Sequence, residues 1–328
     1  MPKVLVTDHT FDPLDIEQRI LEPLGAVLDA HQCKTAEQLV PLVADADAVL
    51  TQFSPVNAQV IAAMKKVRVI VRYGIGVDNV DLEAARQRGI PVCNVPDYCI
   101  DEVADHTLAF ILAATRQVVP NCLGVRGGQW GLAVPLSEMR TLHDLTVGVV
   151  GFGRIGRAVV GRLQPFGCRV HVFDPAVNSK EIESTDAAAV SSLDELLPGC
   201  DVLTLHCPST AQTRRMVNAA RLANMKRGSI LINLARGDLV DTQALVAALQ
   251  SRHLAAAALD VCDPEPIPPD HPLLRIPNAI VAAHVASTSA RAVRTLRETA
   301  AALVAKRLRG EALPNIVNGV TTCRCEQE

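Results

Sequence analysis

Short apolar runs alternate with amphipathic, helix-length stretches along most of the chain. In the first third, five such runs lie at residues 3–7, 26–28, 48–50, 67–71 and 91–95. Strands buried in parallel sheets read as continuous apolar runs, and strands that alternate with helices build doubly wound sheets. The pattern therefore predicts a parallel α/β unit within roughly the first 100 residues.

The rest of the chain repeats this alternation after a connecting region. A long amphipathic helix is predicted over residues 101–119, opening at Asp101, and a stretch containing Pro and Gly follows at 120–143. A last helix is predicted over residues 288–309, and the tail at 313–315 is expected to return to the first unit. Further strands are predicted to begin near residues 146, 169, 201, 229, 255 and 279.

Composition agrees with a folded enzyme of two domains. The chain has 328 residues, of which 49% are hydrophobic, and this length exceeds the usual single core. A net charge of −3 and only nine aromatic residues (one Trp, two Tyr and six Phe) give no reason to expect nucleic acid as a partner. We find neither an apolar run of membrane-spanning length nor a signal-peptide pattern, so we expect a cytoplasmic protein without a membrane partner.

The ten cysteines are scattered through apolar segments, as at Cys93, Cys168 and Cys200. Reduced, buried thiols are the simplest interpretation in a chain of this type. Cys323 and Cys325 supply two metal ligands, whereas structural zinc sites use four, so no metal is expected.

A glycine motif, G-F-G-R-I-G at residues 151–156, follows the apolar run at 146–150 and precedes a helical pattern. In this order of strand, turn and helix, the first glycine permits the turn, the second lets backbone approach a pyrophosphate, and the third packs helix on strand. The next strand ends at Asp174, where a carboxylate binds ribose hydroxyls and repels a 2'-phosphate. The motif predicts NAD as the cofactor. The alternative is that Asp174, followed by Pro175, caps the next turn.

Three charged or titratable residues follow predicted strands and stand in distinctive local sequences. Arg236 lies in N-L-A-R-G-D, Glu265 in L-D-V-C-D-P-E-P, and His284 in A-A-H-V-A-S. An Arg can grip a carboxylate, a Glu can pair with a His, and a His can exchange a proton with a carbonyl oxygen. Together they predict a reductase site for 2-oxo acids, although each alone is also typical of a surface or structural residue.

With these motifs, and with R-Y-G-I-G-V-D-N at residues 72–79, the chain resembles the D-isomer-specific 2-hydroxyacid dehydrogenase family over nearly its whole length. The segments at 95–99 and 102–106 look most like bacterial members of the branch that includes the C-terminal binding proteins. The resemblance implies two doubly wound parallel-sheet domains with a cleft between them. A discontinuous substrate-binding domain would comprise residues 1–100 and 287–328, and an NAD-binding domain residues 101–286.

The resemblance also implies roles for individual residues. Arg236, Glu265 and His284 would be catalytic, with the Glu265 charge favouring the protonated imidazole. Substrate would meet Arg236 and the backbone of Tyr73, Gly74, Ile75 and Gly76. Cofactor contacts would come from Val103, Gly151, Gly153, Arg154, Ile155, Gly156, Asp174, Cys207, Pro208, Thr213, Ala235, Asp260 and His284, with Asp260 orienting the nicotinamide carboxamide.

The expected activity is NAD-dependent reduction of a 2-oxo acid to the R-hydroxy acid by a homodimer. The substrate stays open because V-A-S-T follows His284 where the family usually has paired glycines. Two alternatives are an NADH-sensing interaction module like the C-terminal binding proteins, and another NAD-linked oxidation on the same fold. Formate enzymes of this family have Gln in the position of Glu265, which disfavours one such oxidation.

Two further residues stay ambiguous. His106 on the long helix is either structural or close to substrate, and Trp130 belongs either to a dimer arm or to the substrate mouth.

Overall fold

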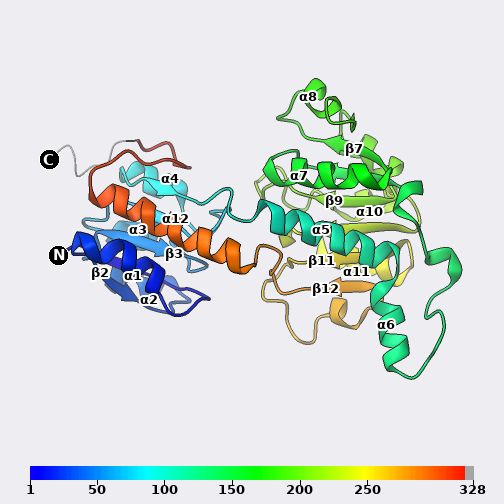
Figure 1. Ribbon diagram of the computed structural model, residues 1–328, viewed down its shortest axis with the longest axis horizontal. Coiled ribbons are helices and arrows are strands. Elements are labelled where there is room, and N and C mark those ends of the chain that lie inside the picture. The colour runs from blue at the N-terminus through cyan, green and yellow to red at the C-terminus, as the bar shows by residue number, and fades with distance from the viewer. Residues whose placement is uncertain (322–328) are drawn as a thin grey trace. The chain divides into compact units, whose positions relative to one another are not determined.

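The computed structural model describes residues 1–321, which form two compact α/β units (Figure 1). Unit 1 contains residues 1–98 and the segment from residue 289 onward, and unit 2 contains residues 99–288. The predicted fold class of two doubly wound parallel sheets is confirmed. The chain passes between the units at residues 98/99 and 288/289, two residues from the predicted boundaries at 100/101 and 286/287.

Unit 1 is built on a five-stranded sheet in the order β2-β1-β3-β4-β5, with every pair of neighbours parallel. This is the flavodoxin-like order of a doubly wound sheet. All five strands overlap the predicted apolar runs, with ends that differ from them by up to three residues. They are β1 (Lys3–Val6), β2 (Val27–Ala30), β3 (Ala48–Thr51), β4 (Ile70–Arg72) and β5 (Val92–Cys93).

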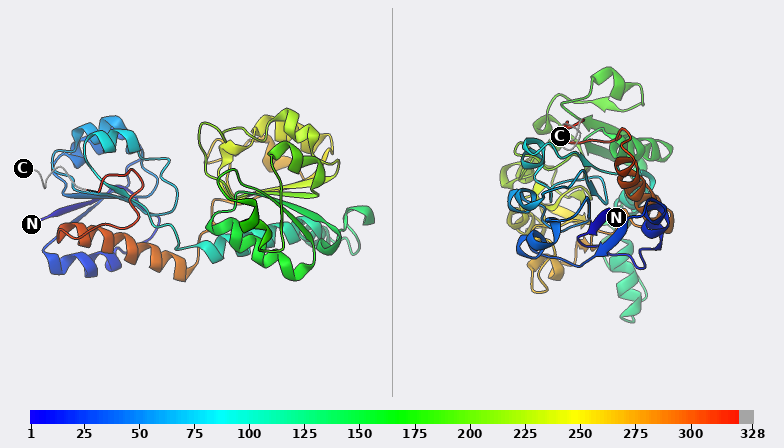
Figure 2. Two further views of the ribbon diagram at one scale, coloured as in Figure 1. Left: turned by 90° about the horizontal axis from the view of Figure 1, so that it is seen from above. Right: turned by 90° about the vertical axis from the view of Figure 1, so that its left-hand side faces the viewer.

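Successive residues of these strands point to opposite faces of the sheet, and each face has its own apolar cluster. Leu5 and Val49 pack toward α2, α3 and α4, whereas Val4 and Leu50 pack toward α1 and α12. The left view of Figure 2 shows these helices on the two sides of the sheet. The helices are α1 (Asp15–Leu21), α2 (Ala36–Val43), α3 (Ala58–Ala63), α4 (Leu82–Gln87) and α12 (Ala290–Leu308).

A buried ion pair joins the first and last helices of unit 1. Glu17 on α1 is fully buried, and its carboxylate accepts hydrogen bonds from Arg297 Nη2 on α12 at 2.7 Å and from the Tyr73 hydroxyl at 3.1 Å. Arg297 also donates to the Pro13 carbonyl oxygen and lies over the Phe11 ring. The chain ends of unit 1 are therefore fastened together in its core.

Unit 2 is built on a seven-stranded parallel sheet in the order β12-β11-β10-β9-β6-β7-β8. The order reverses between β6 and β9, which makes the carboxyl ends of these two strands the switch point where doubly wound sheets bind ligands. The strands are β6 (Thr146–Val150), β7 (Arg169–Phe173), β8 (Ala188–Ala189), β9 (Val202–Leu205), β10 (Ser229–Asn233), β11 (Leu254–Leu259) and β12 (Ala279–Val281). The two-residue strand β8 is missing from the sequence-based prediction because so short a run has no readable period.

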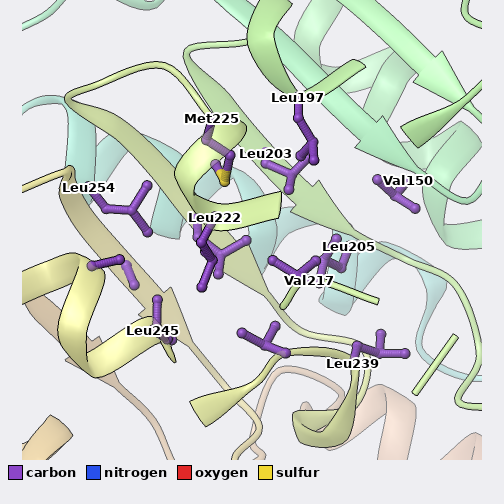
Figure 3. Packing of buried hydrophobic residues seen from close by; sticks show 14 of the residues in the cluster. Val150, Leu197, Leu203, Leu205, Val217, Leu222, Met225, Leu239, Leu245 and Leu254 are labelled. Carbon is purple, nitrogen blue, oxygen red and sulfur yellow. The ribbon is translucent and has the colours of Figure 1, made fainter. Parts of the chain in front are cut away.

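Helices cover both faces of this sheet. One face packs on α9, α10 and α11 through Leu203, Leu222, Leu245 and their neighbours (Figure 3), and α5 packs along α7 and against β10 and β11. The helices of unit 2 are α5 (Ile100–Thr115), α6 (Val118–Arg126), α7 (Arg154–Leu163), α8 (Ser179–Glu183), α9 (Leu193–Leu196), α10 (Ala219–Asn224) and α11 (Thr242–Gln250).

The predicted helix over 101–119 is wrong at its end, because α5 stops at Thr115, and the Pro- and Gly-containing stretch at 120–143 begins within a second helix. The chain turns at Gln117, which adopts a left-handed φ of 53°, and α6 then starts at Val118. Pro120 explains the break, because in a continuous helix its ring would clash with the carbonyl of residue 116 and lose a hydrogen bond. In the first turn of a new helix the missing N–H costs nothing.

The C-terminal segment returns to unit 1, as predicted. Ile316 bridges Cys93 in β5, and the Val317 N–H donates to the Val92 carbonyl oxygen at 2.9 Å. Cys323 and Cys325 lie outside the described residues. Within residues 1–321 no single helix is long and apolar enough to cross a membrane, and only the pair α5 and α6, bent by 64°, passes that test together.

Candidate active site

The glycine turn lies at the switch point of unit 2, between β6 and α7. Gly151 has a φ of +96°, and a Cβ added to it would lie 2.8 Å from the backbone of His206 and Cys207, so the turn needs glycine here. A Cβ on Gly156 would lie 2.0 Å from the Gly151 carbonyl oxygen, which explains the close contact of helix and strand. At Gly153 a Cβ would meet nothing within 4 Å. Packing inside the protein therefore does not require the second glycine, whereas close approach of a pyrophosphate does.

Asp174 follows β7 and reaches back to the turn. Its Oδ2 accepts the Phe152 N–H at 2.7 Å, and its Oδ1 accepts the Ala176 N–H at 2.8 Å. The second bond is the turn-capping contact of the alternative interpretation, so that role is present. Because each carboxylate oxygen accepts more than one hydrogen bond, ribose binding by the same side chain stays a prediction.

The loop after β9 begins against the glycine turn and is fastened by its own side chains. The Thr213 hydroxyl donates to the Pro208 carbonyl oxygen at 2.7 Å, and burial raises the pKa of the Cys207 thiol to about 11. Desolvation lowers the pKa of His206 to about 3, so its ring stays neutral, with Nε2 2.9 Å from the Thr204 hydroxyl. Cys207 is accordingly an uncharged thiol rather than a nucleophile, and its contact with the cofactor stays a prediction.

Arg236 follows β10 in a turn organised by Asn233. The Asn233 side chain is almost fully buried, accepts the Ala235 N–H at 3.0 Å and donates to the Arg236 carbonyl oxygen at 2.8 Å. Arg236 Nη1 donates to the Ala235 carbonyl oxygen at 2.7 Å. Sequence reasoning gave Asn233 no role of its own. A polar residue ending an otherwise apolar strand was the available signal.

Glu265 and His284 form the contact predicted for them. His284 Nδ1 lies 2.6 Å from Glu265 Oε1, and the side chains are 32% and 40% exposed for the His and the Glu. Burial favours a higher pKa for Glu265, but the hydrogen bond and charge of His284, the Cys262 N–H and the Arg236 charge outweigh it and lower that pKa from 4.5. The pairing through Nδ1 assigns Nε2 to any chemistry on the opposite side of the ring.

Asp260 holds the backbone that carries His284. Its carboxylate accepts the N–H groups of Val285 and Ala286, both at 2.9 Å, and its carbonyl oxygen accepts the His284 N–H at 2.8 Å. Three successive N–H groups thus point at one residue, and His284 itself has a left-handed φ of 54°. A non-glycine residue pays a steric cost in this region, which the Asp260 contacts offset. The structure therefore gives Asp260 a positioning task besides the predicted contact with nicotinamide.

The predicted substrate loop lies in unit 1, and two of its four amides are already engaged. The Tyr73 N–H continues the sheet ladder to the Thr51 carbonyl oxygen at 2.8 Å, and the Gly74 N–H donates to the Arg72 carbonyl oxygen at 2.9 Å. Both N–H groups have an acceptor within the protein, and the contact of Tyr73 and Gly74 with substrate stays a prediction. The proposed roles of Ile75 and Gly76 stay predictions.

Other predicted residues fall at different places. Val103 is a buried side chain on α5, Arg154 is exposed at the start of α7, and Ile155 is partly buried there. His106 packs edge-on against Phe110 within α5, a structural contact. Among the described residues no group of three or more His, Cys, Asp or Glu side chains could hold a metal ion, and none of the eight described cysteines is in a disulfide.

Comparison with known proteins gives consistent matches. Residues 108–286 match the family described as "D-isomer specific 2-hydroxyacid dehydrogenase, NAD binding domain". A glyoxylate reductase of Korarchaeum cryptofilum is 38% identical over 287 residues, 85% of each chain. A D-3-phosphoglycerate dehydrogenase of Methanocaldococcus jannaschii is 37% identical over 320 residues, 97% of this chain but 60% of that protein's length. A D-lactate dehydrogenase from Aquifex aeolicus, solved with NAD and lactic acid, matches with a TM-score of 0.84 and 28% identity, covering 94% of this chain and 96% of its own.

Proposed function

Because the chain belongs to the D-isomer specific 2-hydroxyacid dehydrogenase family, we propose that it interconverts a small 2-oxo acid and the corresponding D-2-hydroxy acid with NAD as the cofactor. One observation carries the proposal for this chain's own residues: the 2.6 Å contact between His284 and Glu265, with the Arg236 charge acting on the same carboxylate. Reduction of the carbonyl group of an oxo acid requires a proton donor, a partner that orients it and a cation for the carboxylate, and His284, Glu265 and Arg236 would fill these three roles.

In the proposed reaction, bound NADH supplies the hydride to the C2 carbonyl carbon. Protonated His284 gives its Nε2 proton to the carbonyl oxygen as negative charge develops there, and takes it back in the oxidative direction. Glu265 stays ionised because its pKa is lowered, so it keeps the imidazole in one orientation and stabilises the charged form. Asp260 holds the His284 backbone through this cycle of protonation.

Arg236 would bind the substrate carboxylate. A guanidinium presents a planar fork that matches two carboxylate oxygens, and its charge polarises the neighbouring carbonyl. The Asn233 turn limits the freedom of Arg236, so less entropy is lost when substrate is bound.

Unit 2 fits a dinucleotide. Gly153 leaves the N-terminus of α7 open, and the charge of a pyrophosphate is stabilised at such a terminus. Asp174 at the end of β7 and the proline that follows it offer no cation for a 2'-phosphate, which supports NAD over NADP.

We also propose a homodimer. Exposed apolar side chains gather between residues 118 and 136, in α6 and the following segment, and Trp130 is 93% exposed. Patches of this kind are typical of protein interfaces, and a second copy is the simplest partner. Cytoplasmic location and affiliation with the C-terminal binding protein-like branch stay predictions, resting on reduced cysteines and on the segments at 95–106.

A panel of 2-oxo acids with NADH tests the activity. Glyoxylate, hydroxypyruvate, pyruvate and bulkier 2-oxo acids would each be assayed by loss of NADH absorbance, and D- and L-hydroxy acids in the reverse direction. We expect turnover of at least one oxo acid, selective oxidation of the D-isomer, and a loss of about two powers of ten or more in His284→Gln. A native protein that binds NADH but reduces no 2-oxo acid would refute the proposal.

A further inference from the structure

Asp238 joins two loops of unit 2 that carry different predicted tasks. It lies in the short 3-10 helix Gly237–Leu239, two residues after Arg236. Its Oδ2 accepts the Ser209 hydroxyl at 2.7 Å and Arg214 Nε at 3.1 Å, and its carbonyl oxygen accepts the Arg215 N–H at 2.7 Å. All three donors belong to the loop that follows β9.

That loop borders the dinucleotide turn. The backbone of His206 and Cys207 lies so close to Gly151 that a Cβ there would be 2.8 Å away. Because β6 and β9 flank the switch point of the sheet, the loop begins at the edge of the crevice in which a doubly wound sheet binds its ligand. A cofactor bound at the turn would therefore lie beside the loop that Asp238 contacts.

The other side of Asp238 is fixed to the catalytic segments. A Cβ on Gly237 would lie 1.9 Å from the Cys262 carbonyl oxygen, so residues 236–238 are wedged against the loop that carries Glu265. The Cys262 N–H in turn lies 3.3 Å from Glu265 Oε2. Residues 236–238 therefore contact both the loop after β9 and the segment that carries Glu265.

The carboxylate of Asp238 also has unused bonding capacity. Its Oδ1 is buried and has no hydrogen-bond partner among the described residues, whereas Oδ2 takes both side-chain donors. A buried carboxylate oxygen without a donor is energetically unfavourable. A small movement of the loop that brings a donor to this oxygen would therefore lower the free energy. The contact is thus suited to respond when the loop moves.

We propose that Asp238 is a positioning residue that couples the cofactor loop to Arg236, so that NADH and a 2-oxo acid each strengthen the binding of the other. The inference rests on the proposed function, since it assigns the two ligands to the two loops. Ser209 and Arg214 are the donors through which the coupling passes. We assign no contact with the reacting atoms to any of the three.

The test measures the coupling itself. NADH is titrated by its fluorescence with and without saturating oxamate, an unreactive analogue of a 2-oxo acid, and the ratio of the two Kd values is the coupling factor. We expect a factor of about 5 or more in the native protein, a factor within about 2 of unity in Asp238→Asn, and an intermediate value in Ser209→Ala. The Kd for NADH alone should change less than the factor does.

Asp194→Asn is the matched control, because Asp194 also grips an arginine of another segment of unit 2, Arg221, at 2.8 Å and 3.1 Å. The Asp194→Asn variant should have the same coupling factor as the native protein. The inference is overturned if a folded Asp238→Asn variant keeps the coupling factor of the native protein, or if the native protein itself has a coupling factor of 1. If thermal unfolding shows that Asp238→Asn does not fold, the coupling factor of Ser209→Ala tests the inference instead, and a factor equal to that of the native protein overturns it. Failure of the proposed function is distinct, because it would be seen as no NADH binding or no oxo acid turnover in the native protein.

Discussion

Each unit contains a glutamate paired with a cationic partner, and the two pairs differ in almost every other respect. In unit 1, Glu17 is fully buried and meets Arg297, which is always charged, together with the Tyr73 hydroxyl. In unit 2, Glu265 is 40% exposed and meets His284, a residue type that can either carry a charge or be neutral. The first pair joins helices that are 280 residues apart in sequence, whereas the second lies at a sheet edge among turns.

The contrast shows that the burial of a carboxylate and the type of its cationic partner decide whether a short contact stabilises the fold or takes part in chemistry. A buried pair with a permanent cation has one stable protonation state, so it holds structure and cannot exchange protons. Burial and the Glu17 charge also raise the pKa of Tyr73, which keeps that hydroxyl a donor. The pair of Glu265 with His284 is partly exposed, so water can reach it. Substitutions should therefore affect stability in the first case and chemistry in the second.

Removing the buried carboxylate should give the largest effect. Glu17→Ala leaves Arg297 charged and largely without its partner, and we expect a loss of about 3 to 5 kcal/mol in the free energy of unfolding. Chemical denaturation measures it. Glu83→Gln, which alters an exposed pair with Arg86 in the same unit, should leave stability within error. A Glu17→Ala variant as stable as the native protein would mean that the buried pair does not fasten unit 1.

The substitution Arg236→Lys should have a smaller effect, and this effect should be confined to the catalytic rate rather than to stability. Lysine keeps the charge but loses the planar fork, so we expect a loss of about 2 to 4 kcal/mol in transition-state stabilisation, read from kcat/KM on the best oxo acid. NADH affinity should be nearly unchanged. Arg252→Lys, at an exposed arginine 3.6 Å from Glu138, serves as the control. Near-native kinetics in Arg236→Lys would place the carboxylate anchor at another residue.

Asp174→Ala should have a smaller effect again, because the side chain already accepts the Phe152 and Ala176 N–H groups and, in our proposal, the ribose hydroxyls as well. We expect NADH to bind about 1 to 3 kcal/mol more weakly, with a relaxed rejection of NADPH. Titration of both cofactors against the native and variant proteins measures both. Unaltered NADH affinity would reduce Asp174 to the turn cap that the Ala176 contact already shows.

The sequence predicted those parts of the molecule whose signal is local. The glycine motif at 151–156 sits between a strand and a helix, and Arg236, Glu265 and His284 each follow a strand, so topology alone brings them to one edge of the sheet. The family prediction is confirmed by the match over residues 108–286.

The parts that sequence reasoning missed depend on contacts between distant segments. The sequence around Glu17 does not predict its contact with Arg297, and the sequence around Ser209 does not predict its contact with Asp238. Hydrogen-bond partners that are far apart in sequence leave no periodic pattern. Asp260 was noticed but given only its contact with cofactor, since its grip on the 284–286 backbone depends on the left-handed turn at His284. The helix break at Gln117 was missed because Pro120 reads equally well as the start of a loop.

The pairing of Glu265 with His284 is the central claim, and pH-rate profiles of Glu265→Gln in both directions test it most directly. Reduction needs protonated His284, and the ionised Glu265 favours that form. Removal of the charge should therefore move the basic limb of the reduction profile to lower pH by about one unit. The acidic limb of the oxidation profile, which needs the neutral imidazole, should move the same way by a similar amount. Limbs that stay fixed, or move to higher pH, under conditions where chemistry limits the rate would contradict the account.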